Sequence, residues 1–264
     1  MQVALFVEGS SSPPPPRALP ALERIWNRHL CATSGIQGFS LVVPISKKHL
    51  VAMDPENPKM SGASEPLDLL LSRYIAREAI EAAVVAWDLV PAWNPTEAMC
   101  RWDETVSFYC SLAATDELPH AWVAYARDRC ADLRARRAPG SRSRVPPLVP
   151  GACLALCMEP MFEDLLVSDE NAVKRALGVS GSPRGWPPWQ PSPTPDRKLL
   201  TPAIAALPAR SAVRRRVRGD FRTRKDDWGE YILRQLLSDD DARATVVDHP
   251  VVTRLGELLR ARET

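Results

Sequence analysis

The chain of 264 residues is 45% hydrophobic and 25% charged, and its formal net charge at neutral pH is +2. This composition is that of an ordinary globular protein with enough apolar material for a full core, and it excludes a chain that stays disordered overall. Because the charges nearly balance, any affinity for nucleic acid must come from local clusters of Arg and Lys.

The first part of the chain alternates between strand-like and helix-like segments. Apolar residues at helical spacing predict helices, and short apolar runs bounded by turn residues predict strands. An alternation of this kind predicts an α/β fold with a mainly parallel central sheet flanked by helices. The expected order is a strand at 2–7, a helix at 19–31, a strand at 39–45, a helix at 67–79 and a strand at 82–88.

Two of these strands have a predictable place in the sheet. The run from Ala82 to Asp88 has no polar alternation, which is typical of a central parallel strand buried on both faces. Pro44 has no N–H group to donate to a neighbouring strand, so the strand at 39–45 is expected either to lie at an edge of the sheet or to end early.

The rest of the chain is predicted to be mostly helical, with one further strand. We expect a single elaborated domain over 1–264, with a core at about 1–178 and a basic, helical and proline-rich extension at about 179–264. The expected segments are helices at 96–115 and 120–137, a loop at 138–150, a strand at 153–158, short helices at 162–167 and 170–177, an irregular connection at 178–208, and helices at 228–237 and 251–260.

The N-terminal run and the cysteines bear on the cellular compartment. The apolar run MQVALFV has no basic leader and stops at Glu8, which is too early for a signal-peptide core or a membrane span. We therefore expect a cytoplasmic protein that is not inserted in a membrane. The six cysteines form no CxxC pair, and in a reducing cytoplasm they are expected to be free, mostly buried thiols.

Two acids stand at predicted strand ends, Glu8 after the first strand and Asp88 after the central one. Parallel sheets carry their chemistry at the carboxyl ends of the strands, and neighbouring strands lie about 4.8 Å apart. If these strands are neighbours, the two carboxylates can share a Mg²⁺ or Mn²⁺ ion, which would polarise a phosphoryl oxygen and orient a water. The alternative is that the acids only cap helices.

The pattern VALFVEG, a helix, then VVAWD resembles the Toprim fold of topoisomerases, primases and overcoming-lysogenization-defect nucleases. The signature of that fold is a strand ending in Glu-Gly and a later strand ending in Asp-x-Asp. The block MFEDLLVSDENAVKRALG, from Met161 to Gly178, is similar to a stretch of small Toprim-like bacterial proteins that often accompany ATPases in phage-defence neighbourhoods. The resemblance implies a metal-dependent phosphodiesterase and an ATPase as its partner.

Carried onto this sequence, the resemblance implies that Glu8 is the metal-binding or acid/base glutamate and that Asp88 is the first acid of the Asp-x-Asp pair. The second acid is missing, because position 90 is Val90. Glu163 is the preferred substitute as a metal ligand, although an acid there could instead favour the start of a helix. The other acids that could substitute are Glu159 and Asp169.

The span from Arg210 to Lys225 carries the strongest concentration of charge in the chain. Clustered cations neutralise the phosphates of nucleic acid without reading its sequence, so we predict that this span binds DNA or RNA. Lys225 could also neutralise charge that develops on a scissile phosphate. The alternative is a solvated helix face balanced by nearby acids. The predicted nucleic-acid-binding residues are Arg214, Arg215, Arg216, Arg218, Arg222 and Arg224.

Together these features predict a Mg²⁺- or Mn²⁺-dependent nuclease, or a nuclease-related subunit, for which the resemblance implies a role in phage defence. Because the acid at position 90 is missing, an alternative is that the chain is a non-catalytic subunit that binds nucleic acid or a partner protein. A hydrolase of a nucleotide or small phosphorylated ligand is the third alternative. The predicted catalytic residues are Glu8, Asp88 and Lys225, and the predicted metal ligands are Glu8, Asp88 and Glu163.

Overall fold

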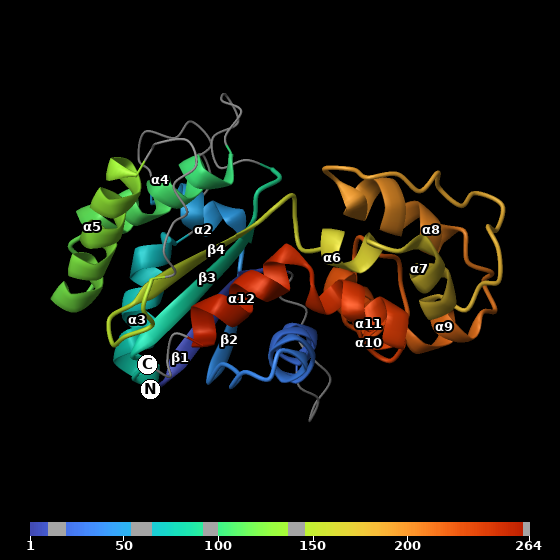
Figure 1. Cartoon of the computed structure of the whole chain (residues 1–264), viewed down its shortest axis with the longest axis horizontal. Coiled ribbons are helices and arrows are strands. Elements are labelled where there is room, and N and C mark those ends of the chain that lie inside the picture. Colours follow the sequence, from blue (N-terminus) through green and yellow to red (C-terminus); the bar gives the residue numbers. More distant parts are fainter. Residues whose placement is uncertain (10–19, 54–64, 92–99, 137–145, 261–264) are drawn as a thin grey trace. The chain divides into compact units, whose positions relative to one another are not determined.

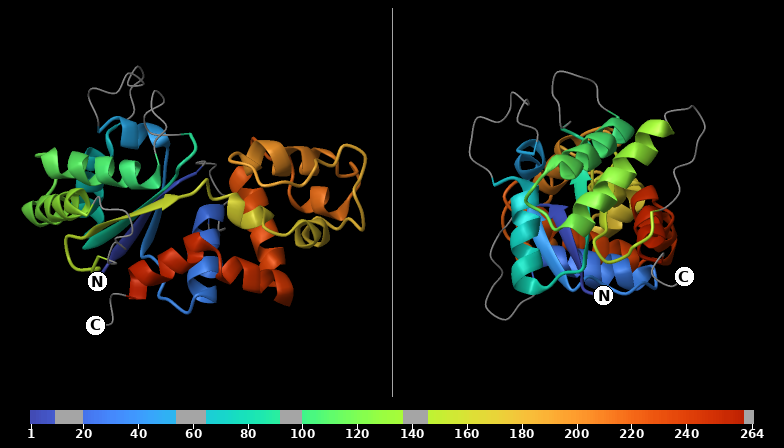
Figure 2. Two further views of the ribbon diagram at one scale, coloured as in Figure 1. Left: turned by 45° about the horizontal axis from the view of Figure 1, so that its top comes forward. Right: turned by 90° about the vertical axis from the view of Figure 1, so that its left-hand side faces the viewer.

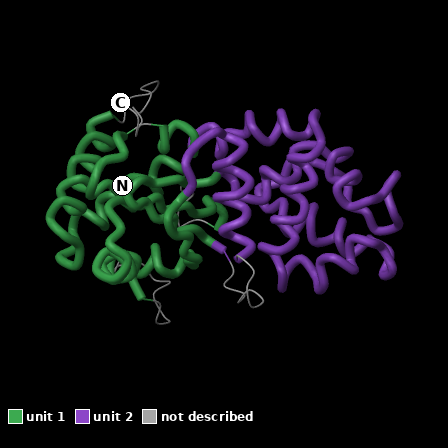
Figure 3. The backbone as a smooth tube through the Cα atoms, turned by 90° about the horizontal axis from the view of Figure 1, so that it is seen from below, with its two compact units in different colours: residues 1–8, 39–158, 255–264 green, residues 9–38, 159–254 purple. Residues whose placement is uncertain are grey.

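The computed structural model describes residues 1–9, 20–53, 65–91, 100–136 and 146–260 (Figure 1). The backbone divides into two compact units, and each is built from segments that are far apart in the sequence (Figure 3). The boundaries fall elsewhere than at the expected division near residue 178. Unit 1 comprises Met1–Glu8, Phe39–Met158 and Leu255–Thr264, and unit 2 comprises Gly9–Gly38 and Glu159–Arg254.

The centre of unit 1 is a parallel sheet of four strands in the order β2-β1-β3-β4. This confirms the predicted α/β fold with a parallel sheet. Every residue of β3 is buried, as its apolar run predicts, and β2 lies at the edge that Pro44 indicates. The strands are β1 (Val3–Glu8), β2 (Leu41–Ile45), β3 (Ala82–Asp88) and β4 (Cys153–Met158).

The strand order defines where the winding of the sheet reverses. From β1 the chain first adds β2 on one side, and it then adds β3 and β4 in turn on the other side. The direction therefore changes between β1 and β3. In open α/β sheets, the carboxyl ends of the strands at such a switch point are where ligands bind.

Helices cover one face of this sheet (Figure 2). Alternate strand residues such as Phe6, Val85 and Trp87 point to that face, because side chains in a strand alternate between its two faces. They pack against Leu71 of α3 and Phe108 of α4. The helices of unit 1 are α2 (Lys47–Val51), α3 (Leu67–Glu78), α4 (Arg101–Ala114), α5 (His120–Ala135) and the end of α12 (Pro250–Arg260).

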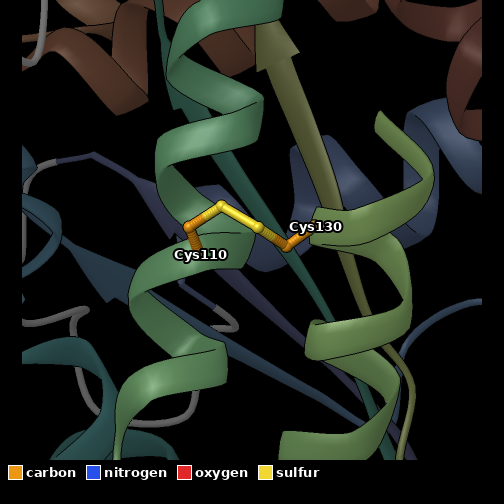
Figure 4. The surroundings of a disulfide bond; sticks show 2 residues. All are labelled: Cys110 and Cys130. Atoms are coloured by element: carbon orange, nitrogen blue, oxygen red, sulfur yellow. A yellow bond between two sulfur atoms is a disulfide. The ribbon is translucent and has the colours of Figure 1, made fainter. Parts of the chain in front are cut away.

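A disulfide joins Cys110 of α4 to Cys130 of α5, with the two Cα atoms 5.2 Å apart (Figure 4). The expectation of free thiols was wrong for this pair, because two helices that pack side by side bring distant cysteines into bonding range. The reducing compartment stays a prediction. The free cysteines in the described part of the chain are Cys31, Cys153 and Cys157, all buried, and the exposed Cys100.

Within the described residues of unit 2, helices are the only regular secondary structure. Its longest helix, α10, buries Trp228, Ile232 and Leu233 completely. Asp169 is the N-cap of α7, and its side chain accepts hydrogen bonds from the N–H groups of Asn171 and Ala172. The helices are α1 (Ala21–Glu23), the π-helix η1 (Arg24–Cys31), α6 (Asp164–Val167), α7 (Glu170–Ala176), the π-helix η3 (Asp196–Leu200), α8 (Thr201–Ala205), α9 (Ala212–Arg216), α10 (Lys225–Leu237), α11 (Asp240–Val247) and the start of α12.

Five helices, α2, η3, α8, α9 and α11, were not predicted. The prolines of the 178–208 stretch suggested an irregular connection, but Pro195 precedes η3 and Pro202 lies in the first turn of α8. Pro195 is tolerated because the first N–H groups of a helix have no partner within it. Across the described ranges, no helix has both the length and the apolar character needed to span a membrane.

Candidate functional site

Glu8 and Asp88 lie together at the carboxyl edge of the sheet. Because β1 and β3 pair in parallel, with Val7 opposite Ala86, the two acids end their strands at the same edge. The Asp88 N–H group donates a hydrogen bond of 3.0 Å to Oε2 of Glu8. Asp88 is 9% exposed and Glu8 is half-buried. The two acids therefore lie at the same edge of the sheet, on the two strands that flank the switch point.

Two further charged residues, which were not predicted, lie at this edge. Lys47, the first residue of α2, donates through Nζ to the backbone carbonyl of Asp88 and lies 3.0 Å from Oε2 of Glu104. Glu104 on α4 is 0% exposed and also accepts a 2.7 Å hydrogen bond from the indole N–H of Trp87. We call this set the carboxyl-edge cluster: Glu8, Lys47, Trp87, Asp88, Glu104 and Cys157.

Cys157 of β4 completes the cluster as a neutral thiol. Its Sγ lies 3.9 Å from Oε2 of Glu104, to which the thiol donates. Burial raises the pKa of Cys157 well above its ordinary value, and the negative charges of Glu104 and Asp88 raise it further, although Lys47 opposes them. At neutral pH this sulfur is therefore neither a thiolate nucleophile nor a thiolate metal ligand.

The donor atoms of the cluster suit a hard divalent cation. The cluster contains three acids, Glu8, Asp88 and Glu104, and one lysine, Lys47, so acids outnumber cations in it. No group of three or more His, Cys, Asp or Glu within the described ranges is arranged to hold a metal, and Val90 brings no oxygen side chain. Mg²⁺ commonly binds through one or two carboxylates and completes its shell with waters and substrate phosphates, so Glu8 and Asp88 fit such an ion.

Gly9, which follows Glu8, has a packing reason to be glycine. A Cβ atom added there would come within 2.9 Å of Cδ1 of Leu22, closer than real Cβ atoms approach other atoms. Gly9 therefore packs directly against Leu22 within unit 2.

Unit 2 contains a separate ionic group, the Lys225 cluster, in which the partly exposed Lys225 pairs with two buried acids, Glu163 and Asp196. The Nζ atom of Lys225 lies 2.8 Å from Oε1 of Glu163 and 3.2 Å from Oδ2 of Asp196. The two acids are 7% and 8% exposed. Glu163 Oε2 and Asp196 Oδ1 are buried and have no hydrogen-bond partner in the part of the chain that the structure describes. Glu163 and Lys225, predicted separately, therefore contact each other.

The three acids considered as substitutes for the missing one differ in their surroundings. Glu163 occupies the N-cap position of α6 but makes no capping hydrogen bond there, because its side chain binds Lys225. Asp169 is already engaged in capping α7, where it accepts from two backbone N–H groups. Glu159 is exposed. Glu163 is thus the buried acid of the three.

The predicted basic span lies in unit 2, and most of its arginines face solvent. Arg214 differs, because its Nη2 donates to the carbonyl groups of Ile204 and Ala205 at the end of α8. Arg224 forms an ion pair of 2.6 Å with Asp227. Arg214 therefore holds two helices together, and the remaining arginines provide the surface charge. The exposed arginines are Arg210, Arg215, Arg216, Arg218, Arg222 and Arg224.

Two of the missed residues, Lys47 and Glu104, have features in the sequence that mark them as candidates, although these features do not reveal their partners. Lys47 follows the carboxyl end of a predicted strand, as Glu8 and Asp88 do, and the same rule would have included it. Glu104 stands four residues before Phe108, in line with the apolar face of its helix. A charged residue in an apolar stripe needs a partner when it is buried. No comparable signal marked Asp196.

Comparison of the chain with protein-family models gave no match, and searches of curated proteins and of solved structures found no significant similarity. The functional argument therefore depends on the geometry of the chain itself.

Proposed function

We propose that the chain is a Toprim-like, Mg²⁺- or Mn²⁺-dependent enzyme that hydrolyses the phosphodiester bonds of nucleic acid. The observation that carries this proposal is the meeting of Glu8 and Asp88 at the carboxyl ends of β1 and β3. This is the switch point of the sheet, the place where α/β folds bind ligands. A bound ion would supply Lewis-acid polarisation of a phosphoryl oxygen.

The residues of unit 1 divide this work between them. The carboxylates of Glu8 and Asp88 would hold the ion, and a carboxylate at this edge can accept the proton of an attacking water. Lys225 is less suited to contact a scissile phosphate, because two buried carboxylates already offset its charge. The arginines of the basic span would bind the phosphate backbone of the substrate.

Replacing either acid of the edge should abolish metal-dependent cleavage. Glu8→Gln and Asp88→Asn keep the size of each side chain but remove the charge that holds the cation. We expect cleavage of labelled single-stranded DNA, double-stranded DNA or RNA by the wild-type chain with Mg²⁺ or Mn²⁺, and background rates in both variants. Glu78→Gln, an exposed site on α3, is the matched control. Cleavage that survives both substitutions would refute the proposal.

Neutralising three exposed arginines should weaken nucleic-acid binding and reduce its salt dependence. Arg215, Arg216 and Arg218 are exposed and form no ion pair with a described residue. Removing one cation that binds a phosphate lowers the slope of log K against log salt by about one, so replacing all three by Gln should lower it by up to about three. The control replaces three other cations of unit 2, Arg197, Lys198 and Arg243, by Gln. An equal decrease of the slope in this control would show that binding depends only on the total charge of the protein.

A second candidate function is a non-catalytic nucleic-acid-binding subunit. It is favoured by Val90, which leaves the edge without the second acid of the Asp-x-Asp pair. Salt-sensitive binding with no turnover, unchanged in Glu8→Gln, would support this candidate. Turnover of nucleotides without cleavage of polymers would instead support a hydrolase of small phosphorylated ligands.

A further inference from the structure

Glu104 is a fully buried carboxylate to which three donors from different elements converge on one oxygen. Its Oε2 lies 3.0 Å from Nζ of Lys47, 2.7 Å from Nε1 of Trp87 and 3.9 Å from Sγ of Cys157. These donors come from α2, β3 and β4. A buried ion pair is costly to desolvate and is often no more stable than an apolar replacement. Its presence beside the candidate site therefore calls for a reason other than stability.

The Lys47 side chain reaches across the end of β1. Lys47 lies two residues after Ile45 of β2, and Ile45 pairs with Glu8 of β1. The Nζ atom of Lys47 nevertheless donates to the carbonyl oxygen of Asp88 on β3. The strand order is β2-β1-β3, so β1 lies between these two strands. The lysine thus extends over the strand end that carries Glu8.

The main chain of Asp88 is held by side chains on both sides of the residue. Its N–H group donates to Glu8 at 3.0 Å, and its carbonyl group accepts from Lys47, which is held in turn by Glu104. The next N–H group, that of Leu89, donates a hydrogen bond of 2.8 Å to the carbonyl oxygen of Met158. With both peptide groups tied, the direction in which the Asp88 side chain leaves the strand is fixed.

We propose that Glu104 and Lys47 are positioning residues for the metal site. Glu104 fixes the position of the Lys47 ammonium group, and Lys47 holds the Asp88 peptide in the orientation that binds the ion. This inference rests on the proposed function, since it assigns the two residues a role toward the ion that Glu8 and Asp88 bind.

Binding of Mn²⁺ alone to the full-length chain, followed by electron paramagnetic resonance, tests this role without any turnover. Glu104→Gln keeps the shape of the side chain but removes its charge, which frees the Lys47 ammonium group to compete with the cation. Loss of a group that orients a metal ligand typically weakens metal binding by about 10–100-fold, and we expect a loss in this range. Glu78→Gln should bind as the wild type does.

The double variant Lys47→Met/Glu104→Gln shows whether weaker Mn²⁺ binding comes from lost positioning of Asp88, from a change of charge at the site or from unfolding of the protein. It leaves no unpaired buried charge, so it should fold even if Glu104→Gln alone does not. The summed charge of the pair is also unchanged. We expect Mn²⁺ binding to remain about 10-fold or more weaker than in the wild type, because the Asp88 carbonyl has lost its donor. Wild-type affinity in a folded double variant would overturn the inference.

Mn²⁺ binding by the Glu8 and Asp88 variants distinguishes failure of the positioning role from failure of the proposed function. If Glu8→Gln and Asp88→Asn bind Mn²⁺ as the wild type does, the metal site itself is wrong. If both lose binding while the Lys47 and Glu104 variants keep it, only the positioning role is wrong.

Discussion

Lys225→Met should lower the free energy of unfolding of unit 2 by about 3–5 kcal/mol, the usual effect of removing one partner of a buried ion pair. The substitution keeps much of the aliphatic side chain but leaves Glu163 and Asp196 without their shared cation. The side chains of these acids are only 9% and 11% exposed, so water compensates them poorly. Guanidinium unfolding and hydrogen exchange of the α10 amides measure the loss.

Three variants show whether this loss comes from charge. Lys225→Arg keeps a cation and should cost much less. Lys198→Met removes an exposed lysine of the same unit and should change little. Adding Glu163→Gln to Lys225→Met removes one of the stranded charges and should restore part of the stability. A loss below about 1 kcal/mol in Lys225→Met would place this ion pair with ordinary surface pairs and contradict the expectation.

Removing the disulfide by Cys110→Ser and Cys130→Ser should lower the free energy of unfolding by about 3 kcal/mol. The two cysteines are 20 residues apart in sequence, and a cross-link that closes a loop of this length restricts the unfolded chain by about that amount. Denaturant unfolding of the oxidised protein, with and without reductant, measures the effect. Reduced wild-type protein should behave like the double variant.

Counting thiols provides the control for this expectation. Of the six cysteines, four should react with a thiol reagent in denaturant without reductant, and all six after reduction. Cys100→Ser, at an exposed position, should leave stability unchanged. Six reactive thiols in protein kept from reductants would show that the bond does not form.

The strands could be predicted from the sequence because each is a short apolar run with clear ends. The bounds of β3 and β4 match the runs that end at Asp88 and Met158. The helices that were missed lack such a signal. In η3 and α8, prolines at the starting positions resemble those of a loop, and α11 begins with consecutive aspartates that can equally belong to a turn.

The candidate site could be predicted only where a local rule applied. Glu8 and Asp88 end strands, and the strand-end rule identified both. Glu104 could not be placed without knowing that α4 packs on the carboxyl edge, and Lys47 reaches its partner across an intervening strand. The pairing of Glu163 with Lys225 depends on residues 62 positions apart, which spacing does not reveal.

The interleaved path of the chain through its two units also affects how the protein is made. Unit 1 includes β1 near the start of the chain and buries Leu255 and Leu258 near its end, while unit 2 is built mostly from the segment between them. During synthesis the sheet can form early, but the leucines that complete its packing leave the ribosome only after the whole of unit 2. Unit 1 therefore cannot be complete until all of unit 2 has been synthesised, although its first strand is made first.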